Sequence, residues 1–245
     1  MNLANKSPFS SNSIRSKKVM LLTVVAIALT ACGRPVANSS TASTVDTAME
    51  KAVDDPICAE GGTCVVGDTG PGGGKVFYVA PTDFTSIGSA CGTSCKYLEA
   101  APTGWITGTT PAGQTNCGTS GTSTADPKCG WSGNTATNIG KTSTALGTGY
   151  ANTSAMITQS NIAGMAATVA RAFQGGGKID WYLPSKDELN LAFLQKISIG
   201  GFTSDFNWSS SEFDGKNAWV QSFLDGFQGL VNKTNSYFVR PVRAF

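Results

Sequence analysis

The residues best suited to chemistry in this chain of 245 residues are its seven cysteines, because the sequence contains no histidine. Without histidine, a serine or cysteine nucleophile lacks its commonest activating base, and a metal site lacks its commonest side-chain ligand. The cysteines also lack the C-x-x-C spacing that is typical of zinc sites. The sequence therefore predicts no catalytic residue, no metal ligand and no cofactor.

A glycine-rich stretch that ends in lysine, GDTGPGGGK at residues 67–75, raises the question of a phosphate-binding loop. Such a loop needs a glycine, four residues and then Gly-Lys-Ser/Thr at the start of a helix. Here Thr69 stands where the first glycine belongs, and Val76 follows the lysine. The next residues, KVFYVA, are β-branched and aromatic, as in a strand. The glycines therefore predict a tight turn that feeds a strand.

The N-terminal segment has the pattern of an export signal. Arg15, Lys17 and Lys18 precede an apolar run of 13 residues at 19–31, which is too short to span a bilayer and suits a signal-peptide core. The run ends in Leu-Thr-Ala-Cys, which resembles the bacterial lipobox, where the cysteine is lipidated. We therefore expect a lipoprotein signal peptide at 1–31 and acylation of Cys32.

Export and acylation place the protein in the cell envelope, attached by its lipid to the outer membrane or the cell surface. Residues 32–56 are rich in small and polar residues and predict a flexible tether. Removal of residues 1–31 takes away four of the 18 basic residues and none of the 16 acidic ones, so the mature chain has a net charge of −2. Nothing in this charge pattern indicates a nucleic-acid partner.

Six cysteines remain after Cys32, and an even number in an exported chain predicts disulfides. Six cysteines allow about 15 connectivities. Their order along the chain favours three local pairs, which are Cys58–Cys64, Cys91–Cys95 and Cys117–Cys129.

Residues 57–245 are long enough for one domain with a sizeable core. A glycine- and threonine-rich insertion at 103–149 has little periodicity and is expected to be anchored by Trp105 and Trp131. One helix is predicted over 160–173. A second begins at the capping box formed by Ser185 and Glu188, and its expected buried stripe is Leu189, Ala192, Phe193 and Ile197.

The end of the chain has short alternating runs separated by glycine, aspartate and asparagine, with a hairpin turn expected at Asp225–Gly226. The order of elements predicts an α+β fold, in which two helices pack on an antiparallel β meander that carries the long insertion. Arg240 and Arg243 stand three apart on the last run and would face opposite sides. We expect one of them to be partly buried against a carboxylate.

Three segments carry a resemblance to a known family. They are DWYLPSKDELNLAFLQK at 180–196, GGFTSDFNWSSSEFDGKNAWVQSFLDG at 200–226 and KTNSYFVRPVRAF at 233–245. Together they resemble the Lcl C-terminal domain family of exported bacterial domains, with its W-x-LP-[ST]-x-x-E-L, W-S-S-[ST]-E, A-W-x-x-x-F-x-x-G and V-R-x-V-R motifs in order. The glycine-rich turn and its strand also match the opening of many members.

The resemblance implies a C-type-lectin-like layout, similar also to formylglycine-generating domains. The family is named for the end of a collagen-like surface adhesin that recognises sulfated glycosaminoglycans and assembles as a trimer. This chain lacks the collagen-like repeat and has a slightly negative mature charge, so a glycosaminoglycan partner and a trimer rest on the resemblance alone.

The W-S-S-S-E strand and the A-W hairpin supply the candidate ligand-binding residues. The tryptophans there are commonly core residues, and the serines commonly bond to backbone. If they are exposed beside the insertion, they offer a stacking surface and convergent polar groups. The predicted ligand-binding residues are Trp208, Ser210, Glu212, Asn217 and Trp219.

Three function classes follow from these observations. The first class is a binding or adhesion module that is anchored at the surface and is not an enzyme. Its ligand would be a glycan or an envelope or host protein. The second is a relative of the formylglycine-generating enzymes, which need cysteine chemistry in a late segment, whereas no cysteine follows Cys129. The third is an envelope structural protein without a ligand. The sequence favours the binding module.

Overall fold

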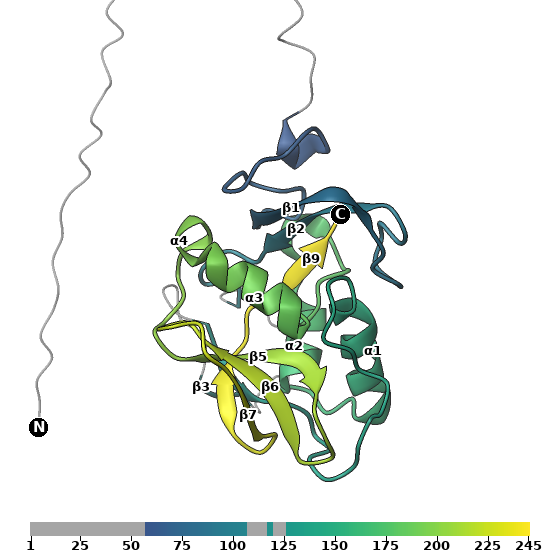
Figure 1. Cartoon of the computed structure of the whole chain (residues 1–245), viewed down its shortest axis with the longest axis vertical. Coiled ribbons are helices and arrows are strands. Elements are labelled where there is room, and N and C mark those ends of the chain that lie inside the picture. The colour runs from purple at the N-terminus through teal and green to yellow at the C-terminus, as the bar shows by residue number, and fades with distance from the viewer. Residues whose placement is uncertain (1–56, 107–116, 120–125) are drawn as a thin grey trace, which may run out of the picture. The chain divides into compact units, whose positions relative to one another are not determined.

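The computed structural model describes residues 57–106, 117–119 and 126–245, which form a mixed α+β fold (Figure 1). The expected fold class is therefore confirmed. The predicted signal peptide at 1–31, the tether at 32–56 and Cys32 lie outside the described residues. Within the described ranges, no helix is long and apolar enough to span a membrane.

The first sheet begins with the strand that follows the glycine-rich turn. β1 (Lys75–Phe84) pairs with β2 (Cys95–Ala100), and β2 pairs with β9 (Val242–Ala244), both in antiparallel register. The KVFYVA run is thus a strand, as predicted. The last strand of the chain joins a sheet made by its first strands, which brings the two ends of the domain together (Figure 1).

The second sheet contains the W-S-S-S-E strand. Its order is β3 (Cys117–Thr119), β4 (Lys128–Gly130), β8 (Ser236–Phe238), β5 (Phe206–Glu212), β6 (Asn217–Ser222) and β7 (Gln228–Asn232). β5, β6 and β7 form the expected meander, with Gly226 at φ +86° in the turn. Beyond β7 the chain departs from a single meander, because β8 pairs with the far edge of β5 and β9 joins the first sheet.

Two helices pack beside the second sheet, and both differ from the prediction. α2 (Ala166–Ala172) is shorter than the expected 160–173 helix, and Ile162 lies outside it and is exposed. α1 (Gly149–Gln159) was not predicted at all. Its sequence is mostly small and polar, and it buries Asn152 and Thr153 beside Met156, so it shows no apolar stripe.

The predicted capping box is confirmed at α3 (Lys186–Leu194). Ser185 Oγ accepts the N–H of Glu188, and the Glu188 carboxylate accepts the N–H of Ser185 at 2.8 Å. The expected stripe holds for Leu189 and Ala192, which are buried, but Ile197 is 90% exposed. The reason is that α3 ends at Leu194, and the separate turn α4 (Lys196–Ile199) no longer follows its helical phase.

The described residues have two main hydrophobic clusters. One joins α1, α2 and the inner face of the second sheet around Trp131, Trp181 and Trp208. The other joins α3 to the first sheet through Leu189, Phe77 and Leu98. α3 therefore lies between the two sheets (Figure 1). Two 3-10 turns complete the described elements, η2 at Cys58–Glu60 and η3 at Gly175–Gly177.

The three local disulfides are confirmed. Cys58–Cys64, Cys91–Cys95 and Cys117–Cys129 are bonded, with Cα–Cα distances of 4.8, 5.0 and 4.0 Å. The third joins β3 to β4, two strands within the predicted insertion, and β4 in turn pairs with β8 of the second sheet. Trp105 and Trp131 are both buried, as the anchoring prediction requires.

Candidate functional site

The structure separates the five predicted ligand-binding residues into two groups. Trp208 and Ser210 are fully buried. Trp208 Nε1 donates to the carbonyl of Cys129 at 2.8 Å, while Ser210 Oγ donates to the carbonyl of Pro184 and lies 3.2 Å from Asn152 Nδ2. Neither side chain has exposed surface for a ligand. The serine run instead makes side-chain bonds to backbone, which was the alternative considered from the sequence.

Glu212 is also occupied within the fold. Its carboxylate accepts the N–H groups of Ile139 and Gly140, and it lies 2.6 Å from Lys233 Nζ. The side chains of Glu212 and Lys233 are 2% and 0% exposed. The same ammonium stands 4.7 Å from the ring centre of Trp131. This buried ion pair holds residues 139–140 of the insertion against the end of β5, so Glu212 acts structurally.

Trp219 and Asn217 lie on the other side of the sheet. In the β5–β6 register Trp208 pairs with Val220, so Trp219 points away from the core that holds Trp208. Trp219 is partly exposed and lies opposite Leu230 of β7. Asn217 Nδ2 donates to both carboxylate oxygens of Asp214, which fixes the β5–β6 turn.

Three other side chains complete this surface. The Phe213 ring meets Trp219 edge-on at 6.1 Å between ring centres, and Lys186 Nζ stands 4.2 Å from the Trp219 ring centre. Phe213 and Leu230 are 55% and 41% exposed. We call this surface the Trp219 face, and it consists of Lys186, Phe213, Trp219 and Leu230.

Sequence reasoning missed Lys186, Phe213 and Leu230. The pairing of Trp219 with Leu230 depends on the β6–β7 register, which an Asp-Gly turn specifies only once its type is known. Lys186 comes from the first turn of α3, which the sheet register does not determine. The signal that could have found Phe213 was its position directly after the W-S-S-S-E run.

The glycine-rich turn does bind an anion, but the anion is a side chain of the protein. The Glu99 carboxylate accepts the N–H of Gly72 at 2.9 Å and the N–H of Gly74 at 3.1 Å. A Cβ atom on Gly72 would lie 2.7 Å from Glu99 Oε1 and 2.5 Å from the Trp181 ring, so the close approach requires glycine. This loop is filled by Glu99 and not open to a phosphate.

Both C-terminal arginines are buried and paired, whereas only one was expected to be. Arg240 Nε reaches Asp126 at 2.8 Å, and Arg243 bonds to both Asp180 and Glu99. The expectation assumed one continuous strand, but β8 ends before Arg240 and β9 begins after it. Burial raises the pKa of Asp126 and of Glu99, and the arginine beside each carboxylate opposes that rise.

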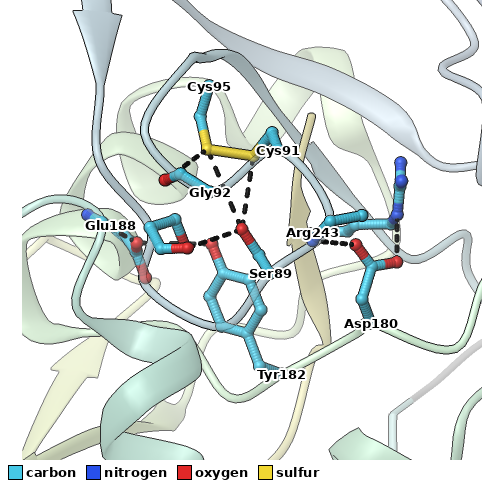
Figure 2. Close-up of a disulfide and its surroundings, with 11 residues drawn as sticks. Ser89, Cys91, Gly92, Cys95, Asp180, Tyr182, Glu188 and Arg243 are labelled. Atoms are coloured by element: carbon cyan, nitrogen blue, oxygen red, sulfur yellow. Dashed lines mark hydrogen bonds and ion pairs between the residues drawn. A yellow bond between two sulfur atoms is a disulfide. The ribbon is translucent and has the colours of Figure 1, made fainter.

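A buried polar cluster surrounds the Cys91–Cys95 disulfide. Figure 2 shows Ser89 beside the two sulfur atoms, with Tyr182 and Glu188 on one side and the Arg243–Asp180 pair on the other. Desolvation raises the pKa of Glu188 to about 7, although N–H groups of Ser185 and Gly147 and the Tyr182 hydroxyl donate to its carboxylate. The Gly147 N–H bond to Glu188 holds α3 to the insertion, and Glu188 and Tyr182 are themselves fully buried, so neither side chain is open to a substrate.

No group of three or more cysteine, aspartate or glutamate residues within the described ranges is arranged to hold a metal ion. No model of a known protein family matches the chain, and a comparison with curated proteins also finds no match. The Trp219 face is therefore the candidate site on geometric grounds alone.

Proposed function

We propose that this protein is a lipid-anchored envelope protein whose domain at 57–245 is a binding module, and that its ligand contacts the Trp219 face. The observation that carries the proposal is the exposure of this face. The other four tryptophans, Trp105, Trp131, Trp181 and Trp208, are buried, and Trp219 alone is partly exposed with apolar neighbours. Exposed apolar patches with a polar rim are typical of interaction sites.

A glycan is the ligand class that this surface suits best. An aromatic ring offers an apolar surface to the C–H face of a sugar, and the flanking polar residues can orient the hydroxyls. The Lys186 ammonium lies over the Trp219 ring, so a sugar ring that stacks on the same face of the ring would take its place. The resemblance to Lcl C-terminal domains, with their C-type-lectin-like layout, supports the same proposal.

Binding rather than catalysis is also supported by the state of the cysteines. A formylglycine-generating mechanism needs a free cysteine thiol, and all six cysteines after Cys32 are in disulfides. The titratable cluster around Glu188 is buried, as described above.

The test is a glycan array, together with an array of envelope and host proteins, probed with the domain from residue 57 onward. The best ligand is then measured against Trp219→Ala and Phe213→Ala, each checked for folding by thermal melting. We expect both variants to lose binding. Phe227→Ala is the matched control, since Phe227 is 62% exposed on the same hairpin but outside the face. Wild-type affinity in both face variants would place the site elsewhere, and the absence of any ligand would favour a structural envelope protein.

The anchor has its own test. Metabolic labelling with an alkyne analogue of palmitate should mark the wild-type protein and miss the Cys32→Ser variant, because acylation requires the thiol. Equal labelling of both proteins would exclude Cys32 as the acceptor.

A further inference from the structure

β7 forms one edge of the second sheet and pairs with β6 in an antiparallel register that has no shift. Ser222 donates its N–H to the carbonyl of Phe227 at 2.8 Å. Because backbone bonding alternates along an antiparallel ladder, every second residue from Phe227 onward bonds to β6. The residues between them, Gln228, Leu230 and Asn232, turn their N–H and C=O groups to the open edge.

This edge is free and unprotected. Among the residues that the structure describes, none donates to or accepts from the outward backbone groups of Gln228 and Leu230. The Asn232 carbonyl accepts the N–H of Asn235 at 3.0 Å in the turn that follows. Natural edge strands are commonly blunted by a charge, a proline or a bulge, and β7, with the sequence QGLVN, has none of these. The edge is therefore able to accept another extended strand.

Apolar side chains lie exposed along the same edge. Leu230 is 41% exposed on the outer face, and Phe227 is 62% exposed at the start of the strand. The Phe227 ring lies beside Gly229, where a Cβ atom would be 2.7 Å from Phe227 Cε1. On the inner face Val231 is only partly buried, although it packs against the cluster around Trp208. An added strand would therefore cover apolar surface as well as pair backbone groups.

The order of side chains in β7 fits a second copy of the same strand. A two-fold axis at Leu230 places each Leu230 opposite the other, Gly229 opposite Val231, and Gln228 opposite Asn232. The leucines meet as an apolar pair, each valine faces a residue without a side chain, and each pair of amides can exchange a hydrogen bond. The same register sets the outward backbone groups of the two strands opposite one another. The strand carries no charge, so the axis opposes no like charges.

We propose that two copies of this protein pair through β7, antiparallel and with Leu230 on the two-fold axis, so that their second sheets form one continuous sheet. On the outer face, Trp219 lies beside Leu230 in each copy, and the pairing brings the two Trp219 faces next to each other. The contact is made by β7 itself and needs no ligand. It therefore stands or fails independently of the binding function proposed above.

The test traps this dimer with a disulfide. β7 has five residues, whereas stable interfaces have about 20–30 a side, so the association is reversible and is best detected as a covalent product that accumulates. Directly opposed residues of a hydrogen-bonded antiparallel pair have Cα atoms about 5.5 Å apart, and a disulfide needs about 4.4–6.8 Å. The full-length Leu230→Cys variant, purified in detergent and treated with a mild copper oxidant, should therefore convert to a cross-linked dimer on a non-reducing gel. Its yield should rise with protein concentration.

Asn232→Cys is the matched control, because Asn232 is also exposed and lies on the same face of the same strand. In the proposed register the two Asn232 positions are about 14 Å apart along the strands, which is too far for a disulfide. This variant alone should give no cross-link, whereas a mixture of Asn232→Cys with Gln228→Cys should give one, because these positions are opposed. Peptide mapping should find the new bond beside the three native disulfides, and thermal melting checks that each variant folds.

Two results would overturn the proposal. The first is equal cross-linking of Leu230→Cys and Asn232→Cys, which would indicate random collision rather than one register. The second is the absence of a cross-link both in Leu230→Cys and in the mixture of Gln228→Cys with Asn232→Cys. The mixture also decides the question if Leu230→Cys does not fold, since it leaves Leu230 in place.

Discussion

Trp208 and Trp219 lie on neighbouring strands, and the structure uses them in opposite ways. Trp208 faces the cluster shared with α1 and α2, is fully buried, and bonds to the backbone of β4. Trp219 points to the other side, where α3 covers the sheet only in part, and it contacts Lys186 and Phe213 at the surface. The comparison teaches that strand position, and not residue type, decides which tryptophan stabilises the fold and which is available to a ligand.

The largest effect is expected from Trp208→Ala. Truncating a fully buried tryptophan removes its packing and leaves a cavity, at a cost of about 3–5 kcal/mol. The variant also leaves the Cys129 carbonyl without its donor. Urea unfolding of wild type and variant measures the difference in unfolding free energy, and we expect the variant to unfold at a much lower urea concentration than the wild type.

Trp219→Ala is measured in the same urea unfolding experiment, for comparison with Trp208→Ala. Its losses are cross-strand and ring contacts at a partly exposed site, which amount to about 1–2 kcal/mol. Equal destabilisation by the two substitutions would show that Trp219 is also a core residue, and it would weaken the case for a ligand surface.

Glu212 lies at the end of the same strand as Trp208, and its replacement is expected to cost nearly as much. Glu212→Gln removes one partner of a buried ion pair and leaves Lys233 charged and buried, which costs about 3–5 kcal/mol. The double variant Glu212→Gln, Lys233→Met removes both charges and should recover much of that loss. If the single variant unfolds like wild type, the carboxylate is accessible to solvent and the ligand role predicted from the sequence becomes tenable.

Glu188 is a second buried carboxylate that holds the insertion, but its partners are N–H and O–H donors. Burial raises its pKa from 4.5 to about 7. Between these values the folded protein keeps a proton that the unfolded chain has released. Stability from this group is therefore fully present at low pH and is lost as pH rises through about 7, by about 3 kcal/mol.

Glu188→Gln tests this pH dependence, because glutamine keeps the capping box but does not titrate. We expect the difference in unfolding free energy between wild type and variant to change between pH 4.5 and pH 8, with the wild type losing stability relative to the variant. If the unfolding free energies of the two proteins change in parallel with pH, the Glu188 pKa is not raised.

The parts of this fold that could be predicted from the sequence are those set by nearby residues. The Ser185–Glu188 box, the Asp225–Gly226 turn and the pairs Cys58–Cys64 and Cys91–Cys95 each join residues a few positions apart. Their geometry follows from local hydrogen bonds or from short loops, so no knowledge of tertiary structure is needed.

The parts that could not be predicted depend on pairings between distant segments. Burial of Ser210 follows from its contact with Asn152 of α1, a helix whose polar sequence gave no periodic signal. The structural role of Glu212 depends on Lys233, which is 21 positions away and is brought near by the hairpins. The candidate site differs from the residues predicted from the sequence for the same reason, since only the β6–β7 register shows that Leu230 lies beside Trp219.

The smallest effect on stability is expected from Lys186→Met, although its effect on binding is the most informative. Removal of the ammonium loses a cation–π contact of about 0.5–1 kcal/mol at this partly exposed site. It also removes a positive charge from the first turn of α3, where the helix dipole disfavours it by about 0.3–1 kcal/mol. The two changes oppose each other, so the free energy of unfolding should change little.

A neutral ligand that stacks on Trp219 no longer has to displace the Lys186 ammonium in the Lys186→Met variant, and its affinity should rise by up to about fivefold. Lys216→Met is the matched control, since it removes the same charge from an exposed position on the β5–β6 turn. Weaker binding in Lys186→Met, with Lys216→Met unchanged, would mean that the ligand uses Lys186 directly and carries negative charge or strong acceptors.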